Sequence, residues 1–173
     1  MHRHEITTAA TWQERLADAL IEAGVEVAVW VPDKRLAPIG ARIVQRGISL
    51  RTLPREEECF AYAAGHRAAG GMPLVLLQSS GLGNSLNAIG SLVIPYGLGF
   101  PVVISMRGTL GERNPAQMLL GRTTAGTLGL LGVQAFTLSD PADAVPFAKG
   151  AIAVAEGART LAPILLDGAL ELQ

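Results

Sequence analysis

The chain has 173 residues, of which 49% are hydrophobic, 17% charged and 5% aromatic, and its formal net charge at pH 7 is -1. This length fits one ordinary domain with a sizeable core, and the near-neutral charge excludes the basic surface that nucleic-acid or anionic-membrane binding requires. The charged fraction lies below the roughly 25% of an average soluble domain, so we expect burial against a partner.

The cysteine, the histidines and the apolar runs indicate which cellular compartment to expect for the protein. The single cysteine, Cys59, excludes an intrachain disulfide, and His2, His4 and His66 lack neighbours at the spacing of metal ligands. The first sixteen residues have no apolar core of a signal peptide, and Gly and Pro break the apolar runs well short of the roughly 20 residues of a membrane span. We therefore expect a cytoplasmic protein with no membrane segment.

Amphipathic helical stretches and short apolar runs alternate in the first half of the chain. The stretch 11–24 has apolar residues at a helical period and ends at Gly24. The run PLVLLQ at 73–78 does not alternate polar and apolar residues, which predicts a strand buried on both faces. We predict helices over 11–24, 34–47 and 56–70, and strands over 25–31, 48–53 and 73–78.

The second half continues this alternation after a glycine-rich turn at 79–83. The polar stretch from Arg107 to about Gln117 is the longest irregular segment, and long loops at strand ends often carry function. Repeated alternation predicts an α/β fold: one three-layer domain over 1–173, with a mostly parallel sheet and helices on both faces. Such sheets bind ligands beyond the carboxyl ends of their strands. We predict helices over 84–97, near 124–132 and over 141–157, and strands over 101–106, 133–138 and 161–167.

Three consecutive glutamates, Glu56, Glu57 and Glu58, open the helix predicted over 56–70. Acidic residues in a first helical turn stabilise the helix dipole by roughly 0.3–1 kcal/mol, and this ordinary role alone would account for them. The residues that follow indicate a second interpretation. Gly65 comes nine residues after Glu56, within the stretch AAGHRAAGG, and a predicted buried strand and the stretch SSGLGN come after it. This block resembles the pyrimidine-binding domain of thiamine diphosphate enzymes, in which a glutamate at a helix start lies nine residues before a glycine.

The resemblance implies a catalytic and cofactor-binding role for Glu56. In that family a carboxyl group shares a proton with N1′ of the aminopyrimidine ring, which allows the cofactor to become a carbon nucleophile. Burial raises the pKa of a carboxyl group, so such a group can hold and return a proton near neutral pH. We expect Glu57 and Glu58 to serve the helix dipole or a partner surface.

The stretch QSSGLGN has two interpretations. By itself it is a glycine turn between a strand and a helix with a Ser or Asn cap, which is common in parallel α/β proteins. The resemblance implies instead that it lines the pyrimidine and the substrate, with glycines that let the backbone approach the ligand. The residues expected to bind the cofactor are Gln78, Ser80, Gly81 and Asn84, and Ser80 is also expected to contact the substrate.

Three segments narrow the resemblance: VWVPDKRLAPIG, QSSGLGN and ISMRGTLGERNPAQMLLGRTTAGTLGLLGV. In this order, from about Val31 to Val133, they are similar to the phosphonopyruvate and sulfopyruvate decarboxylases, which carry a Val-Pro-Asp type turn, a Ser-Gly-Leu-Gly-Asn loop and an Arg-Gly loop. The sequence departs from that pattern at Met106, where an aromatic residue is common, and this departure leaves the exact substrate open.

Two residues at strand ends take candidate roles from this resemblance. Asp33 follows Pro32, where an aspartate often caps a helix, and as a site residue it would be a catalytic proton relay. Arg107 would ordinarily lie in a solvated loop or a salt bridge, but a guanidinium fork also suits the sulfonate or phosphonate of a substrate. We predict no metal-ligating residue in this chain.

The resemblance covers the pyrimidine-binding domain and does not include a diphosphate-binding domain. In thiamine diphosphate enzymes a Gly-Asp-Gly…Asn signature marks the domain that holds the diphosphate and Mg²⁺, and this chain has no Gly-Asp-Gly. The resemblance implies an alpha subunit that decarboxylates an anionic 2-oxoacid to an aldehyde and CO₂ only with a diphosphate-binding beta subunit, in a homo- and hetero-oligomer. Two alternatives stay open: a subunit of an acetolactate synthase-like carboligase, and a non-catalytic α/β scaffold subunit.

Overall fold

A computed structural model describes the protein over residues 9–109 and 111–171. The strands are β1 Val27–Trp30, β2 Ser49–Thr52, β3 Pro73–Gln78, β4 Pro101–Ser105, β5 Phe136–Leu138 and β6 Ala162–Leu166. The α-helices are α1 Trp12–Glu22, α2 Ala37–Gln45, α3 Glu56–Ala68, α4 Ser79–Ala88, α5 Pro115–Leu130 and α6 Ala144–Gly157. Short helical turns are η1 Ile89–Val93, η2 Pro141–Asp143 and η3 Gly168–Glu171. No helix in the described ranges is long and apolar enough to cross a membrane.

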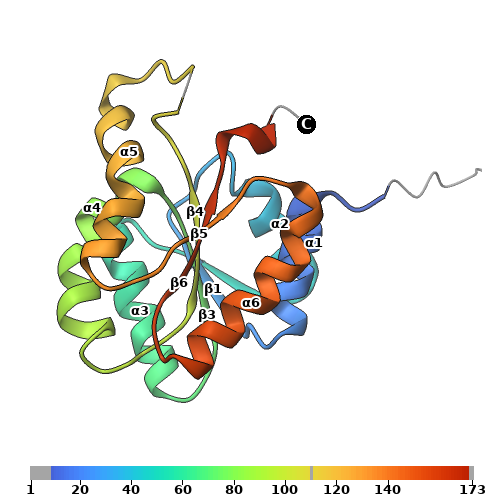
Figure 1. Cartoon of the computed structure of the whole chain (residues 1–173). Helices are drawn as coiled ribbons and strands as arrows, with labels where there is room; N and C mark the ends of the chain where they lie inside the picture. The colour runs from blue at the N-terminus through green and yellow to red at the C-terminus, as the bar shows by residue number, and fades with distance from the viewer. Residues whose placement is uncertain (1–8, 110, 172–173) are drawn as a thin grey trace, which may run out of the picture.

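The six strands form one parallel sheet in the order β2-β1-β3-β4-β6-β5. Helices α1, α2 and α6 cover one face, and α3, α4 and α5 cover the other (Figure 1). This arrangement confirms the predicted three-layer α/β fold. Because the strands are parallel, their carboxyl ends meet at one edge, where such sheets bind ligands.

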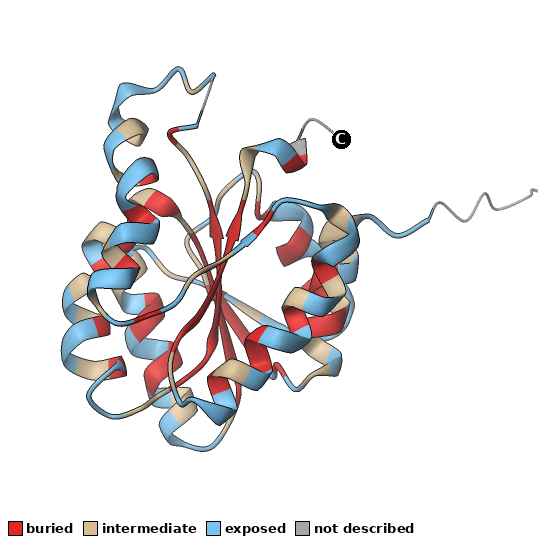
Figure 2. Cartoon of the chain, in the orientation of Figure 1, coloured by how far each residue is buried: buried red, intermediate tan, exposed pale blue. Residues whose placement is uncertain are grey.

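The hydrophobic core lies between the sheet and its two helical layers, as the buried strands and inward helix faces of Figure 2 show. Strand β3 is buried from Pro73 to Leu77, as its continuous apolar pattern predicted. The rings of Phe60 on α3 and Phe100 just before β4 have centroids 6.2 Å apart. Each buried side chain of this size contributes roughly 1.5–3 kcal/mol to folding, so the core holds the strand ends in fixed positions.

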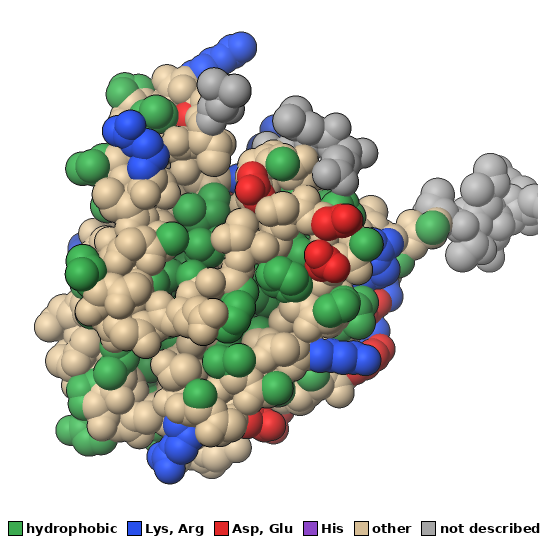
Figure 3. Space-filling model, viewed as in Figure 1, with side chains coloured by type: hydrophobic (Ala, Val, Ile, Leu, Met, Phe, Trp, Pro, Cys, Tyr) green, Lys and Arg blue, Asp and Glu red, His purple; other side chains and the backbone are tan. Residues whose placement is uncertain are grey.

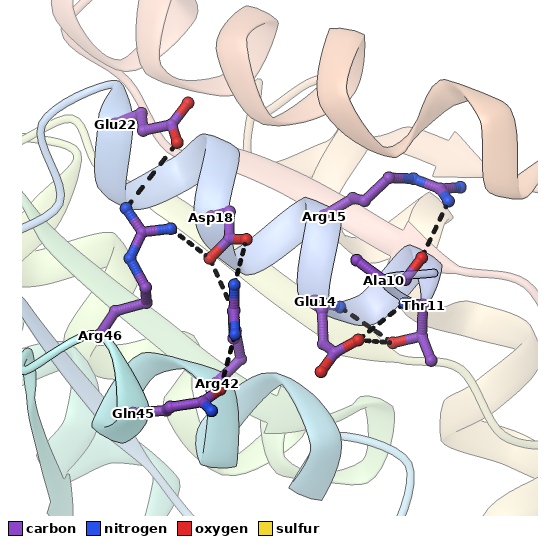
Figure 4. Close-up of polar contacts among 9 residues, drawn as sticks. All are labelled: Ala10, Thr11, Glu14, Arg15, Asp18, Glu22, Arg42, Gln45 and Arg46. Atoms are coloured by element: carbon purple, nitrogen blue, oxygen red, sulfur yellow. Dashed lines mark hydrogen bonds and ion pairs between the residues drawn. The ribbon is translucent and has the colours of Figure 1, made fainter. Parts of the chain in front are cut away.

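Charged residues join α1 to α2 at the surface (Figure 4). Asp18 accepts hydrogen bonds from Nε and Nη2 of Arg42, both at 2.8 Å, and from Nη1 of Arg46 at 2.6 Å. These bonds, above all those from Arg42, lower the pKa of Asp18 below its ordinary value. Thr11 and Glu14 form a capping box that fixes the start of α1.

Helix α4 begins earlier than predicted. The expected glycine-rich turn at 79–83 is wrong, because these residues form the first part of the helix directly after Gln78. Gln78 keeps an extended backbone, with φ -85° and ψ 153°, and precedes the first helical residue. Gly81 lies inside this helix, and the side chain of Glu56 fills the space that a Cβ at Gly81 would occupy. This tertiary packing overrides the low helix propensity of glycine. The chain then continues as a π-helical turn at Ile89–Val93.

Helix α5 is longer than predicted, because it begins at Pro115 and not near Thr124. Asn114 is its N-cap residue, and the Asn114 Oδ1 accepts a hydrogen bond from the Ala116 N–H at 3.1 Å. Proline at the first helical position suits a helix start. Glycines and threonines dilute the apolar period of this helix, so the pattern indicated only its last part. The polar loop after β4 therefore ends at Asn114, not at about Gln117.

Candidate active site

Side chains from four segments meet at the carboxyl edge of the sheet. Asp33 follows β1, Gln78 ends β3 and Arg107 follows β4. The register of β3 and β4 places Gln78 beside Ser105. Glu56 is the first residue of α3, which starts from the same edge after β2. The fold thus brings to one edge candidate residues that lie far apart in the sequence.

A chain of hydrogen bonds links Asp33, Gln78 and Ser80. The Gln78 Nε2 donates to Asp33 Oδ2 at 3.0 Å, and the Ser80 hydroxyl donates to Gln78 Oε1 at 2.7 Å. The Oδ1 of Asp33 accepts from the backbone N–H of Arg35 at 3.0 Å. Asp33 therefore stabilises the turn after β1 and does not cap α2, whose N-cap residue is Leu36. One amide group, that of Gln78, fixes the polar groups on both sides of it.

Glu56 lies against α4 where Gly81 has no side chain. A Cβ at Gly81 would come within 2.2 Å of Glu56 Cγ and 2.6 Å of its Cδ, so only glycine leaves room for the carboxyl group. Asn84 Nδ2 lies 3.5 Å from Glu56 Oε2, a long contact at the same place. The Glu56 side chain is half-buried. The structure therefore brings together Glu56, Gly81 and Asn84, three of the predicted site residues.

The two glutamates next to Glu56 have different surroundings. Glu57 Oε1 accepts a hydrogen bond from Arg55 Nε at 2.5 Å. The pKa of Glu57 is lowered, first by a hydrogen bond from its own backbone N–H and then by the bond from Arg55. Glu58 is exposed to solvent. Because Glu57 is held ionised and Glu58 faces water, Glu56 is the best candidate of the three for a proton carrier.

Arg107 is fixed at three points where the chain leaves β4. Its backbone N–H donates to Ser79 Oγ at 3.2 Å. Its carbonyl packs against Gly121, where a Cβ would come within 1.8 Å of the carbonyl oxygen. Its guanidinium donates through Nε and Nη2 to the two carboxylate oxygens of Glu112, at 2.6 and 2.9 Å. The salt bridge that is ordinary for a loop arginine is therefore present, and binding of a substrate by Arg107 stays a prediction.

Glu112 is absent from the predicted site residues, although it borders Arg107 in the structure. Its side chain is only 8% exposed, and its Oε1 also accepts from the Asn114 N–H at 2.9 Å. The hydrogen bonds from Arg107, followed by that from Asn114, lower the pKa of Glu112 to about 2. The only signal for it in the sequence is an acidic residue five positions after Arg107 in a polar loop.

A cleft of about 960 Å³ opens beside Asp33 and Arg107. Lys34 and Arg113 add positive charge to its lining. Glu56 is not among the lining residues and lies on the side of the sheet that α3 and α4 cover. The candidate site therefore has two parts, and the hydrogen-bonded chain from Asp33 through Gln78 to Ser80 leads from the cleft toward Gly81 and Glu56.

Arg35 joins the ends of three strands beside this cleft. It lies in the turn after β1, and its guanidinium donates through Nη1 to the carbonyl of Met106 and through Nη2 to that of Asp167, the latter at 2.9 Å. Met106 follows β4 and Asp167 follows β6. This contact, which sequence reasoning missed, holds the turn that carries Asp33 against the rest of the sheet edge.

Comparison with known proteins assigns a family. The family described as thiamine pyrophosphate enzyme, N-terminal TPP binding domain, matches residues 10–118. The chain is 38% identical over 125 residues to the sulfopyruvate decarboxylase subunit alpha of Methanothermobacter thermautotrophicus, which covers 71% of this chain and 75% of that protein. It is 32% identical over 156 residues to the subunit of the same name from Methanococcus maripaludis, which covers 89% and 93%. It is 35% identical over 124 residues to a phosphonopyruvate decarboxylase of Streptomyces hygroscopicus, over 70% of this chain and 31% of that protein.

A solved structure has the same fold. A 2-oxoglutarate:ferredoxin oxidoreductase from Magnetococcus marinus matches with a TM-score of 0.72 at 17% identity, over 93% of this chain and 29% of that one. The chain belongs to the thiamine pyrophosphate enzymes, in the family of their N-terminal thiamine pyrophosphate-binding domain. Within that family it is similar to sulfopyruvate and phosphonopyruvate decarboxylases, which confirms the narrower resemblance found in the sequence.

Proposed function

We propose that this chain is the alpha subunit of a thiamine diphosphate-dependent decarboxylase acting on an anionic 2-oxoacid of the sulfopyruvate or phosphonopyruvate type. The products are an aldehyde and CO₂. Two relatives named sulfopyruvate decarboxylase subunit alpha, matched over 75% and 93% of their length, support this proposal. The observation in the structure that carries it is the placement of Glu56 against Gly81 at the carboxyl edge of the sheet.

The residues around Glu56 fit the aminopyrimidine ring of thiamine diphosphate. The carboxyl group lies in the space that Gly81 leaves open, with Asn84 beside it. The Ser80 hydroxyl donates a hydrogen bond to Gln78 Oε1, so toward a ligand its oxygen acts as an acceptor and suits an amino group. We propose Glu56, Ser80, Gly81 and Asn84 as cofactor-binding residues, with Gln78 holding Ser80 in place.

Glu56 is proposed to move a proton at the ring nitrogen. When bound, thiamine diphosphate supplies a carbon nucleophile and an acceptor for the electron pair that the departing CO₂ leaves behind. Glu56 would hold a proton on one carboxyl oxygen and exchange it with the ring nitrogen of the pyrimidine. Asn84, at 3.5 Å from Oε2, would help to orient that carboxyl group.

Asp33 is proposed to relay a proton at the reacting centre. Its Oδ2 accepts from Gln78 and its Oδ1 from the N–H of Arg35, so the carboxylate is held in one orientation beside the cleft. A carboxyl group in a fixed orientation within hydrogen-bond reach of substrate can serve as general acid or base. Gln78 would transmit any change in this orientation to Ser80.

The acidic group of the substrate is proposed to bind in the cleft. Arg107, Lys34 and Arg113 line it, and a guanidinium fork suits the oxygens of a sulfonate or phosphonate. Ser80 is proposed to contact the reacting end of the same substrate. In this proposal the acidic group binds apart from Glu56, which does not line the cleft.

We propose that residues 1–173 form the pyrimidine-binding domain and that a separate beta subunit binds the diphosphate and Mg²⁺. Within 9–109 and 111–171, no three His, Cys, Asp or Glu side chains are grouped as a metal site requires. A groove of about 320 Å³ beside Glu56 is lined by Glu57, Glu58, Asn84 and Asn87, among others. The Glu57 Oε2 is buried without a hydrogen-bond partner in the described part of the chain. A hydrogen-bond donor from a docked subunit would satisfy this oxygen.

The surface also favours association between copies of this chain. The sequence has no charged residue between Arg67 and Arg107, and within that stretch Ile94 and Tyr96 are 37% and 66% exposed. In the view of Figure 3, hydrophobic side chains gather between α5 and α6, and the charged ones lie mostly around the rim. We propose that the chain is at least a dimer by itself and forms a larger oligomer with its beta subunit.

The experiment is to purify the chain with a candidate diphosphate-binding partner and to supply thiamine diphosphate, Mg²⁺ and sulfopyruvate or phosphonopyruvate. Equal amounts of CO₂ and aldehyde are expected. CO₂ without free aldehyde would favour the carboligase alternative. If no complex of the chain binds thiamine diphosphate, the scaffold alternative replaces the proposal.

A further inference from the structure

We propose that Glu112 is a positioning residue that holds the guanidinium of Arg107 for the acidic group of the substrate and thereby sets specificity for acidic 2-oxoacids. This inference rests on the proposed decarboxylase function and adds to it a specificity-determining residue. Both side chains line the cleft beside Asp33.

The contacts of Glu112 hold its carboxylate in one orientation. The two oxygens accept from Nε and Nη2 of Arg107 at 2.6 and 2.9 Å, and Oε1 also accepts from the N–H of Asn114 at 2.9 Å. The Glu112 side chain is 8% exposed, against 29% for Arg107. The less exposed carboxylate is therefore the fixed partner, and the guanidinium is the group that reaches toward solvent.

Arg107 is held at both ends of its long side chain. At the backbone, Ser79 accepts its N–H and Gly121 packs on its carbonyl. At the far end, Glu112 accepts from its guanidinium. A free arginine side chain loses rotamer freedom when it binds a ligand, and a side chain that is ordered beforehand avoids that loss. The structure therefore gives Arg107 the preorganisation that selective binding of a small anion requires.

The opposite role for Glu112 is that of a competitor that occupies the anion site until substrate displaces it. Displacement would break the bonds to Arg107 and also the bond to Asn114, the N-cap residue of α5. A group that helps to shape the start of a helix is poorly suited to leave at each turnover. The two roles predict opposite signs: removing the charge of Glu112 weakens binding of the acidic substrate if it positions Arg107, and strengthens binding if it competes.

The experiment compares Glu112→Gln, Arg107→Gln and the double variant with the parent, each assembled with the beta partner. Sulfopyruvate is the acidic substrate, and pyruvate is the same 2-oxoacid without the sulfonate. Glu112→Gln is expected to raise the KM for sulfopyruvate by about tenfold, as expected for a weakened charge-assisted bond, with a much smaller effect on kcat and on pyruvate. The double variant should be no worse than Arg107→Gln, because the two residues act as one unit.

A binding measurement supports the kinetics. Calorimetric titration with sulfoacetate, which has no 2-oxo group to react, should show affinity lost by a similar factor in Glu112→Gln. Glu156→Gln is the matched control, because Glu156 is exposed on α6, away from the cleft. If Glu112→Gln does not fold, Glu112→Asp keeps the charge on a shorter stem and is expected to raise the same KM by less.

Two outcomes would overturn the proposal. A lower KM for sulfopyruvate, or tighter sulfoacetate binding, would identify Glu112 as a competitor. An equal loss on pyruvate and sulfopyruvate would show a general distortion of the loop and no role in specificity. If the parent complex decarboxylates neither oxoacid, the proposed function is wrong, while the sulfoacetate titration still decides the role of Glu112.

Discussion

Gly81 and Glu56 compete for one small space at the carboxyl edge of the sheet, where a Cβ on the glycine would lie within 2.2 Å of Glu56 Cγ. A methyl group there has to displace the carboxyl group. We expect Gly81→Ala to lower the free energy of unfolding by about 1–3 kcal/mol through overpacking and to abolish productive cofactor binding. Urea unfolding and titration of the assembled complex with thiamine diphosphate measure the two effects.

Gly126→Ala is the matched control for this change. Gly126 also lies inside a helix, but a Cβ there would meet nothing within 4 Å. The substitution should stabilise the protein by up to about 1 kcal/mol, because alanine is the better helix former. If Gly81→Ala keeps both the stability and the cofactor affinity of the parent, the packing of Glu56 against α4 is wrong.

Glu56→Gln tests the proton carrier directly. The change keeps the size of the side chain and its ability to form hydrogen bonds, but it removes the proton that a carboxyl group can exchange. Folding and assembly should therefore stay intact, while turnover falls by roughly 10²–10⁴-fold. Hydrogen–deuterium exchange at C2 of the bound cofactor should slow in the same variant. Glu57→Gln and Glu58→Gln are expected to have far smaller effects. Fast exchange in Glu56→Gln, together with slow exchange in Glu57→Gln or Glu58→Gln, would show that one of the neighbouring glutamates carries the proton and that the assignment to Glu56 is wrong.

Gln78→Met tests the hydrogen-bonded chain between Asp33 and Ser80. Methionine is similar in length but removes the donor to Asp33 and the acceptor for Ser80. A hydrogen bond to a charged group contributes about 1.5–3 kcal/mol, so kcat/KM should fall roughly 10- to 100-fold. Gln134→Met, at an exposed position, is the control. Unchanged kcat/KM in Gln78→Met would mean that the orientation of Asp33 does not matter.

The pair of Glu112 and Arg107 predicts a pH dependence of stability. The pKa of Glu112 falls from its ordinary 4.5 to about 2 in the folded chain. The pair therefore stabilises the protein fully above about pH 4.5, and this contribution is lost as pH falls from about 4.5 to about 2. Urea unfolding of parent and Glu112→Gln should show a stability difference that is constant near neutral pH and shrinks over this window. A difference that stays the same at about pH 3 would contradict the assignment.

Ile94 and Tyr96 test the association of the chain with itself. We expect light scattering to find at least a dimer at micromolar concentration, since these exposed side chains lie in a stretch without charge. Ile94→Lys combined with Tyr96→Lys should shift the chain toward monomer. Val44→Lys, at an exposed residue on α2, is the control. A stable monomer of the parent chain would count strongly against self-association.

The order of elements was predictable because apolar periodicity is a local property. The buried run at 73–78 and the amphipathic pattern at 11–24 became β3 and α1. The start of α4 was not predictable, because glycines at 81 and 83 indicate a turn until the side chain of Glu56 is known to fill the space above Gly81. A tertiary contact between residues far apart in sequence decides that local structure.

The candidate site was predictable only in part, and for a similar reason. Glu56, Gly81 and Asn84 were named from motifs and lie together. Glu112 and Arg35 have no motif, since their importance comes from which groups they meet: Arg107 in one case, and carbonyls at two strand ends in the other. The spacing of residues in the sequence does not predict such contacts, because they depend on the order of the strands in the sheet.

Arg35 connects the turn after β1 to the end of β6, the last strand of the chain. Strands β3 and β4 separate β1 from β6 in the sheet, yet the guanidinium of Arg35 binds the carbonyl of Asp167, a residue 132 positions away in sequence. A truncation or insertion near the end of β6 would remove an anchor from the turn that carries Asp33. Changes close to the carboxyl terminus should therefore alter the chemistry of Asp33, a residue near the beginning of the chain.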